Sequence, residues 1–359
     1  MASDVRPRLR DLGVEIGDYP TGPHNAITDV PGVLVGHQTV IRDEPSVVRT
    51  GVTVVMPRDG AIWDDYAYCA IDHLNGDGEM TGAFWVMESG LLGSPIAITN
   101  THQVGMVRDS VARYGLEEGH DRSFILPVVA ETYDGHLSDA ESFPLTPADV
   151  YSAIRSASSG RVEEGTVGGG TGMICHEFKG GIGTSSRMVS TGRLDVTVAA
   201  LVQANYGNRS DLTIDGIRVG KAIGFDEVPS AWEGGREGED GSIIVVIATD
   251  APLVADQCRR LARRASVGLA RAGGYGHDSS GDIFVAFATG NHLPANSKVR
   301  EIRSLDHTVM TPLLRAAADV VEESIVNALL AAKTIEGRLG RVAHAIPIDR
   351  VRQLVAHRP

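Results

Sequence analysis

Cysteine is scarce in this sequence, and the few cysteines show no pattern typical of a disulfide framework or a metal site. Cys69, Cys175 and Cys258 are the three cysteines among 359 residues, and no two of them are spaced as Cys-x-x-Cys. The twelve histidines form no cluster with the spacing of metal ligands. We therefore expect no disulfide framework and no bound metal.

An excess of basic residues is also missing, as is any long apolar run. The chain has 33 Lys and Arg against 46 Asp and Glu, a net charge of −13, which argues against a nucleic-acid partner. No apolar stretch is long enough to span a membrane, so no membrane partner is expected. The first ten residues lack the apolar core of a signal peptide, and a cytoplasmic location is the default expectation.

Aromatic residues are few, at 5%, whereas the 42 glycines are many, which favours tight turns and close backbone packing. The hydrophobic share of 42% and the charged share of 22% are ordinary for a globular protein. No internal repeat or low-complexity linker divides the chain. We therefore predict one domain over residues 1–359.

The most informative feature is the junction between Gly241 and Ser242. A charged, glycine-rich run over residues 233–240 leads directly into the β-branched stretch 242–249, whose first residue carries a hydroxyl. Cleavage at this point would leave a serine with a free α-amine, which is a nucleophile and a base in one residue. Taken alone, the junction also fits a surface loop that leads into a core strand.

The remaining pattern predicts a layered α/β architecture, because long helical segments flank strands that are apolar on both faces. A capping box, Thr-Pro-Ala-Asp, opens the predicted helix that begins at residue 146. The predicted strands are 33–41, 51–56, 95–99, 124–130, 194–205, 242–249 and 282–288, and the predicted helices are 82–92, 104–114, 146–158, 252–272, 311–334 and 348–356.

Glycine is densest over residues 166–187, with the run Gly-Gly-Gly-Thr-Gly at 168–172. No Gly-Lys-Ser/Thr follows this run, so it lacks the defining part of a phosphate-binding loop. Tight turns, or backbone brought close to an active site, are the better interpretation.

Polar residues gather at three predicted strand ends: Asn205, the pair Glu131 and Tyr133, and the segment 276–282. Each position has an ordinary structural explanation, since polar side chains at strand ends often satisfy backbone groups. His277, in the third segment, is assigned no role.

Taken together, these segments resemble the DmpA/BapA family of self-processing aminopeptidases, which includes L-aminopeptidase/D-esterases and β-peptidyl aminopeptidases. The resemblance covers nearly the whole chain and consists of several motifs in the same order. They are Asn-Gly-Asp-Gly-Glu-Met-Thr-Gly at 75–82, Ile-Thr-Asn-Thr at 98–101, Ala-Glu-Thr-Tyr-Asp-Gly at 130–135, Gly-Gly-Gly-Thr-Gly-Met at 168–173, Gly-Ile-Gly-Thr-Ser-Ser-Arg at 181–187, Val-Gln-Ala-Asn-Tyr-Gly at 202–207, Gly-Ser-Ile-Ile-Val-Val at 241–246 and Ser-Ser-Gly-Asp-Ile-Phe at 279–284.

The resemblance implies a four-layer αββα sandwich, like that of N-terminal nucleophile hydrolases and of ornithine acetyltransferase. It implies self-cleavage before Ser242 into a large fragment, 1–241, and a small fragment, 242–359, that stay together. It also implies no cofactor, a homo-oligomer (often a tetramer), and release of N-terminal amino acids from short peptides, amides or esters.

The same resemblance implies roles for single residues. Ser242 would be the nucleophile, and Ser280 with Asp282 would match a serine and an acidic residue used with it. Asn205 would belong to the oxyanion hole, Tyr133 would be an active-site tyrosine, and Glu131 would hold the free amine of the substrate. Some family members have glutamate where this chain has the shorter Asp282.

Two other functions remain open at this point. An acyltransferase of the ornithine acetyltransferase type has a related fold and self-cleavage but uses a threonine nucleophile, against which Ser242 argues. A non-catalytic homologue that binds amino compounds is the second alternative. No single residue distinguishes among L-, D- and β-amino acyl substrates.

Overall fold

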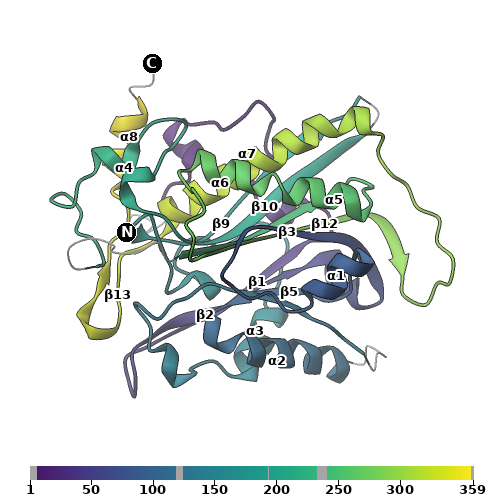
Figure 1. Cartoon of the computed structure of the whole chain (residues 1–359), viewed down its shortest axis with the longest axis horizontal. Helices are drawn as coiled ribbons and strands as arrows, with labels where there is room; N and C mark the ends of the chain where they lie inside the picture. Colours follow the sequence, from purple (N-terminus) through teal and green to yellow (C-terminus); the bar gives the residue numbers. More distant parts are fainter. Residues whose placement is uncertain (1–5, 119–123, 193, 233–240, 357–359) are drawn as a thin grey trace.

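A six-stranded sheet and a four-stranded sheet form the centre of the molecule (Figure 1). The computed structural model describes residues 6–118, 124–192, 194–232 and 241–356. In the larger sheet the strand order is β4-β3-β12-β11-β10-β9, and β11 with β12 is its parallel pair. Its strands are β3 (Asp65–Gly76), β4 (Leu91–Leu92), β9 (Gly181–Ser190), β10 (Asp195–Asn205), β11 (Gly241–Thr249) and β12 (Ser280–Pro294).

The smaller sheet has the order β1-β2-β5-β6, with β5 and β6 parallel. Its strands are β1 (Leu34–Arg42), β2 (Val48–Met56), β5 (Ile96–Thr99) and β6 (Val128–Glu131). Two short hairpins lie outside both sheets: β7 (Ile174–Cys175) with β8 (Phe178–Lys179), and β13 (Ile335–Glu336) with β14 (Val342–Ala343).

Helices cover the outer face of each sheet, which gives four layers, αββα (Figure 1). Helices α5 (Ala255–Ala262), α6 (Ala265–Arg271) and α7 (Met310–Ala331) lie on the larger sheet, and α2 (Val104–Glu117) with α3 (Pro147–Arg155) lies on the smaller one. The remaining helices are α1 (Ala83–Ser89), α4 (Val219–Ala222) and α8 (Ile348–Ala356). The predicted sandwich is therefore the observed one.

The larger sheet is buried on both faces because alternate residues of each central strand belong to different cores. Ile243, Val245 and Ile247 of β11 pack toward the helix layer. Ile244 and Val246, between them, pack in the core shared by the two sheets. Successive side chains of a strand point to opposite faces, so one continuous apolar run supplies two cores.

Strand register decides which residues meet at the start of β11. Ser242 lies opposite Asn205 of β10 on one side and opposite Gly281 of β12 on the other. Gly281 in turn lies opposite Gly76 of β3. Four chain segments that are far apart in the sequence, around residues 76, 205, 242 and 281, are therefore adjacent at one end of the sheet.

The longer sequence-based elements are largely confirmed, with several differences. Strand β3 was not predicted, because Asp65, Asp72 and His73 interrupt its apolar pattern. Strand β9 was not predicted either, because the glycine-rich run over residues 166–187 indicated turns. The predicted helix 252–272 is two helices, α5 and α6, since the apolar spacing continues across the break and gives no sign of it. The predicted helix 82–92 ends at Ser89, and the predicted strand 124–130 begins only at Val128.

The early end of that helix has a local cause. Gly90 has a φ of 70° and donates its N–H to the carbonyl of Val86, which is a glycine C-cap.

Helix α7 is fixed to the sheet by a buried charge cluster as well as by apolar contacts. Glu323 of α7 pairs with Arg187 of β9 at 2.5 Å, and both side chains are fully buried. Arg10 lies 3.2 Å from the same carboxylate, and the Asn25 amide donates to it at 2.6 Å. The carboxylate is thus compensated by two cations and an amide donor, which its burial requires.

Replacing Arg187 by methionine is expected to lower the free energy of unfolding by about 3 kcal/mol, because Glu323 would remain buried with its principal partner gone. Urea denaturation measures the loss. Arg315→Met is the control, since Arg315 pairs with Asp18 on the surface and such pairs contribute less than about 1 kcal/mol. Equal losses in the two variants would contradict the assignment.

Candidate active site

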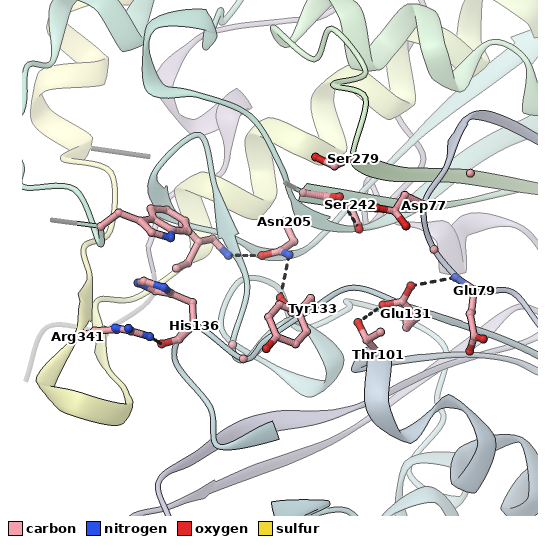
Figure 2. Close-up of a pocket in the computed structure, with 17 residues that line it drawn as sticks. Asp77, Glu79, Thr101, Glu131, Tyr133, His136, Asn205, Ser242, Ser279 and Arg341 are labelled. Carbon is pink, nitrogen blue, oxygen red and sulfur yellow. Dashed lines mark hydrogen bonds between the residues drawn. The ribbon is translucent and has the colours of Figure 1, made fainter. Parts of the chain in front are cut away.

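A cavity of about 740 Å³ opens at the end of the sheets where β11 begins and β6 ends. This size is within the usual range for small-molecule sites. Figure 2 shows the side chains that line it. Of the residues singled out in the sequence, Glu131, Tyr133, Asn205, Gly241 and Ser242 line this cavity.

Ser242 is buried, and its hydroxyl donates to the carbonyl oxygen of Gly241 at 2.6 Å. Its side chain points to the face of the sheet that looks toward the smaller sheet, because it shares the alternation of Ile244 and Val246. The hydroxyl oxygen therefore lies beside the carbonyl group of the preceding peptide bond, on the cavity side.

Glycine at position 241 fits a crowded location. A Cβ there would lie 3.0 Å from the Cα of Tyr206 and 3.2 Å from the carbonyl oxygen of Asn205. Any larger side chain would press against the neighbouring strand β10. The glycine-rich run predicted ahead of this position, 233–240, lies outside the described residues.

Asn205 connects three parts of the site. Its side-chain oxygen accepts from the backbone N–H of Ile174 at 2.8 Å, and its amide nitrogen donates to the carbonyl of Tyr133 at 3.0 Å (Figure 2). An amide nitrogen carries two hydrogens, and this contact uses one of them. The other is available to a group in the cavity next to Ser242.

Glu131 ends β6 and is only 3% exposed. Its carboxylate accepts from the backbone N–H of Glu79 at 3.0 Å and from the hydroxyl of Thr101 (Figure 2). Burial raises the pKa of Glu131 above its usual value, and these two hydrogen bonds oppose the rise. A cation in the cavity would stabilise the charged carboxylate.

Two more carboxylates, Asp77 and Glu79, line the same end of the cavity. The segment that carries them crosses β12 at close range, since a Cβ on Gly281 would lie 2.4 Å from the carbonyl oxygen of Asp77. A Cβ on Gly78 would likewise lie 3.1 Å from the Glu131 carboxylate. Glycine at both positions therefore brings an acidic turn next to Ser242.

Ser280 and Asp282 lie on the other face of the sheet. They line a small hollow with Gly241, Tyr206 and His277, and the Ser280 hydroxyl donates to Asp282 at 2.7 Å. Asp282 shares the alternation of Phe284, which packs toward the helix layer. Burial raises the pKa of the Asp282 carboxyl, an effect opposed by the Ser280 hydrogen bond.

The second serine that lines the main cavity, besides Ser242, is Ser279 (Figure 2). The sequence analysis singled out its neighbour Ser280 instead. Gly241 lines both the cavity and the hollow. The peptide bond between residues 241 and 242 therefore lies between the serines of the cavity and the Ser280–Asp282 pair of the hollow.

Tyr133 follows β6 and has a half-exposed side chain whose ring is 5.8 Å from the ring of His102. It borders the cavity between the acidic end and the opposite end. His136 and Arg341 form that opposite end (Figure 2). Trp232 also lines the cavity and lies beside His136. The His136 and Trp232 rings lie 4.5 Å apart, and Arg341 donates to the carbonyl of His136 at 3.2 Å.

Sequence reasoning missed seven lining residues with polar or aromatic side chains: Asp77, Glu79, Thr101, His136, Trp232, Ser279 and Arg341. Asp77, Glu79, Thr101 and Ser279 lie inside motifs quoted above, so those motifs contained the available signal. His136 directly follows one motif, whereas Trp232 and Arg341 lie in segments with no recognisable pattern. Among the described residues, no group of three His, Cys, Asp or Glu side chains is arranged to hold a metal ion.

Comparison with known proteins identifies the family. A sequence model of peptidase family S58 matches residues 25–343. The chain belongs to peptidase family S58. It is 42% identical over 370 residues to the β-peptidyl aminopeptidase BapA of Sphingosinicella microcystinivorans, covering 99% of this chain and 93% of that protein.

Solved structures of two relatives share the S58 chain's fold over 98% of its length. A β-aminopeptidase from Burkholderia sp. is 47% identical, with a TM-score of 0.91 over all of that chain. The L-aminopeptidase D-Ala-esterase/amidase of Ochrobactrum anthropi is 42% identical, with a TM-score of 0.89 over 98% of that chain, and is described as a serine aminopeptidase with a variant of the Ntn hydrolase fold.

These relatives confirm the predicted family, the α/β fold of the Ntn type and the predicted activity, that of a self-processing serine aminopeptidase. They do not favour the acyltransferase alternative. In the part of the chain that the structure describes, no helix combines the length and the apolar character needed to cross a membrane.

Asn205→Ala is expected to lower the free energy of unfolding by about 1–3 kcal/mol, because it removes the partners of the Ile174 N–H and the Tyr133 carbonyl. Thermal unfolding measures the change. Ser210→Ala on the exposed surface is the control and is expected to leave the melting temperature unchanged. An unchanged melting temperature for Asn205→Ala would show that these two contacts do not stabilise the site.

Proposed function

We propose that the precursor, a single domain over residues 1–359, cuts itself between Gly241 and Ser242, and that Ser242 is then the N-terminal nucleophile of an aminopeptidase. The observation that carries the proposal is the position of the Ser242 hydroxyl, inside the cavity and 2.6 Å from the oxygen of the carbonyl group it would attack. The products are the fragments 1–241 and 242–359, held together by the buried sheet in which β10 pairs with β11.

Self-cleavage proceeds as an acyl shift followed by hydrolysis. The Ser242 oxygen bonds to the carbonyl carbon of Gly241, and the bond from that carbon to the Ser242 nitrogen breaks. The hydroxyl proton passes to the nitrogen, which becomes an amine. Water then hydrolyses the ester, leaving a carboxylate on Gly241 and a free hydroxyl and amine on Ser242.

In turnover, the Ser242 oxygen attacks the carbonyl carbon of the substrate's first amide or ester bond. The second N–H of the Asn205 amide donates to the developing oxyanion, a contact typically worth about 3 kcal/mol in the transition state. The freed α-amine of Ser242, with an ordinary pKa of about 8, accepts the hydroxyl proton and delivers it to the leaving group. Water then hydrolyses the acyl-serine ester, which releases the amino acid and restores the Ser242 hydroxyl. Tyr133 borders the reacting carbonyl from the other side of the cavity.

Ser280 and Asp282 act on the opposite side of the scissile bond. Their hydrogen-bonded pair adjoins Gly241, which supports a role at the Ser242 nitrogen rather than at its hydroxyl. Because the pKa of Asp282 is raised, this carboxyl exchanges a proton with that nitrogen more readily than an ordinary aspartate would.

Glu131 binds the α-ammonium of the substrate, with Asp77 and Glu79 adding negative charge at the same end. This contact restricts the reaction to the first residue of short peptides, amino-acid amides or esters. The acyl group is an L-, D- or β-amino acid, and the names of the relatives support the β class most directly.

Ser242→Ala is expected to abolish both processing and turnover, because it removes the oxygen that attacks in both reactions. Denaturing electrophoresis would show one full-length band in place of two fragments, and hydrolysis of aminoacyl p-nitroanilides would fall by at least a thousandfold. Ser186→Ala is a matched control, since its hydroxyl is buried in β9 away from the cavity. Undiminished hydrolysis by an uncut Ser242→Ala chain would refute the mechanism.

Glu131→Gln is expected to lower kcat/KM for aminoacyl p-nitroanilides by roughly 10- to 100-fold, as expected when one hydrogen bond to a charged group is lost. The ionised carboxylate is the form that binds the ammonium. Wild-type kcat/KM therefore falls as the pH drops through the pKa of Glu131, which lies above that of an ordinary glutamate.

The glutamine variant should lose the part of this acid limb that belongs to Glu131 and keep the part set by deprotonation of the Ser242 α-amine. Its melting temperature at neutral pH should not fall, because a carboxyl whose pKa is raised by folding destabilises the folded state once it is ionised. An unchanged acid limb in Glu131→Gln would assign the titration to another group.

We also propose that the protein forms a homo-oligomer, which the family resemblance indicates is a tetramer. Trp85, Phe124 and Leu126 are 50%, 74% and 37% exposed and line one surface hollow, and apolar side chains gathered on a surface are typical of interfaces. The cytoplasmic location and the lack of a nucleic-acid partner stay predictions from the sequence.

A further inference from the structure

The cavity carries opposite charges at its two ends. Asp77, Glu79 and Glu131 line one end, and Arg341 lines the other, beside His136 (Figure 2). Ser242 and Asn205 lie between the two ends (Figure 2). A substrate whose cleaved bond reaches Ser242 while its ammonium meets the acidic end must extend its leaving group toward Arg341.

The Arg341 side chain has unused hydrogen-bonding capacity. Among the residues that the structure describes, its side-chain contact is one hydrogen bond, donated to the neutral carbonyl oxygen of His136 at 3.2 Å. A guanidinium has five N–H donors in a planar fork, and its preferred ligand is a carboxylate bound through both oxygens. The neutral carbonyl leaves the positive charge of Arg341 uncompensated within the described structure.

The backbone around Arg341 is fixed in place. The carbonyl of Arg341 accepts from the N–H of Gly337, and the N–H of Arg338 donates to the carbonyl of Leu137, each at 2.8 Å. A Cβ on Gly337 would lie 2.3 Å from that same Leu137 carbonyl, so the β13–β14 hairpin touches the segment that follows Tyr133. The backbone that carries Arg341 is therefore fixed beside the cavity wall.

A small apolar cluster supports the same wall. Ala343 of β14 packs with Leu137, Ile174 and Ala231, and Trp232 and Ile335 pack against them. This cluster is separate from the two large cores of the sandwich. The wall thus has its own packing, which places Trp232 beside the position where a leaving group would lie.

We propose that Arg341 binds the C-terminal carboxylate of the substrate, so that the preferred substrates are short peptides with both termini free. This inference rests on the proposed function, because it takes Glu131 as the site of the substrate ammonium. An unblocked short peptide has an ammonium at one end and a carboxylate at the other, which matches the two ends of the cavity. Amino-acid amides and p-nitroanilides lack the carboxylate and forgo this contact.

The test compares a dipeptide with its C-terminal amide. A first assay finds which of the L-alanyl, D-alanyl and β-alanyl p-nitroanilides the wild-type enzyme hydrolyses fastest. That residue is then the N-terminal residue of the dipeptide, and alanine is the second residue. At pH 7.5 and low salt, kcat/KM for the free acid is expected to exceed that for the amide about tenfold, as one charge-assisted contact would give. The ratio should fall as salt is added.

Arg341→Gln is expected to bring the two substrates to equal kcat/KM, mainly by lowering the value for the acid. Arg341→Lys, which keeps the charge but not the fork, should give an intermediate ratio. Arg338→Gln is the matched control on the same hairpin, because Arg338 does not line the cavity, and it should keep the wild-type ratio.

A wild-type ratio of one or below, or an Arg341→Gln variant that slows both substrates by the same factor, would overturn the inference. The ratio of kcat/KM for the acid to kcat/KM for the amide is measured on the wild-type enzyme, so it can refute the inference even if a variant fails to fold. Failure of the proposed function looks different, since the wild-type enzyme would then hydrolyse no p-nitroanilide or would do so equally well after Ser242→Ala.

Discussion

The pairing of β10, β11 and β12 is the constraint on which the whole site depends. Ser242 has no fixed relation to Asn205 or Gly281 along the sequence, and only the strand register makes the three adjacent. A shift of one residue would turn Ser242 toward the helix layer and Ile243 into the cavity. The apolar side chains of β11 alternate between the two cores. They oppose such a shift, because each of them would move from its own core to the opposite face of the sheet.

The same sheet separates two kinds of chemistry. Ser242, Asn205 and Glu131 lie on the side that faces the smaller sheet, where there is room for a ligand. Ser280 and Asp282 lie on the helix side, in a hollow too small for one. A backbone peptide group lies in the plane of a sheet, so groups on both faces can reach the bond between residues 241 and 242 while a substrate contacts one face alone.

Much of this arrangement was predictable from the sequence, and the reasons differ by residue. The strand beginning at Ser242 and the capped helix after Thr146 follow from local patterns of apolar and capping residues. The site residues Glu131, Tyr133, Asn205 and Ser242 were predicted from the motifs of the family resemblance, and all four line one cavity. Strand β3 was missed because polar residues hide its alternation. Ser279 lines the cavity and Ser280 lines the hollow, and this difference depends on where β12 begins, which the local sequence does not encode. Arg341 reaches the cavity through a hairpin contact with Leu137 that joins distant parts of the chain.

The hairpin formed by β13 and β14 belongs to neither large sheet and has its own small cluster of apolar contacts. Neither of its strands pairs with β10, β11 or β12, so a change in its sequence need not alter the register that aligns the reacting groups. Two enzymes with this scaffold could share every reacting atom and still differ in which molecules they accept. Exchanging residues 335–343 between relatives would transfer that selectivity as a module, which makes this segment a natural starting point for redesign.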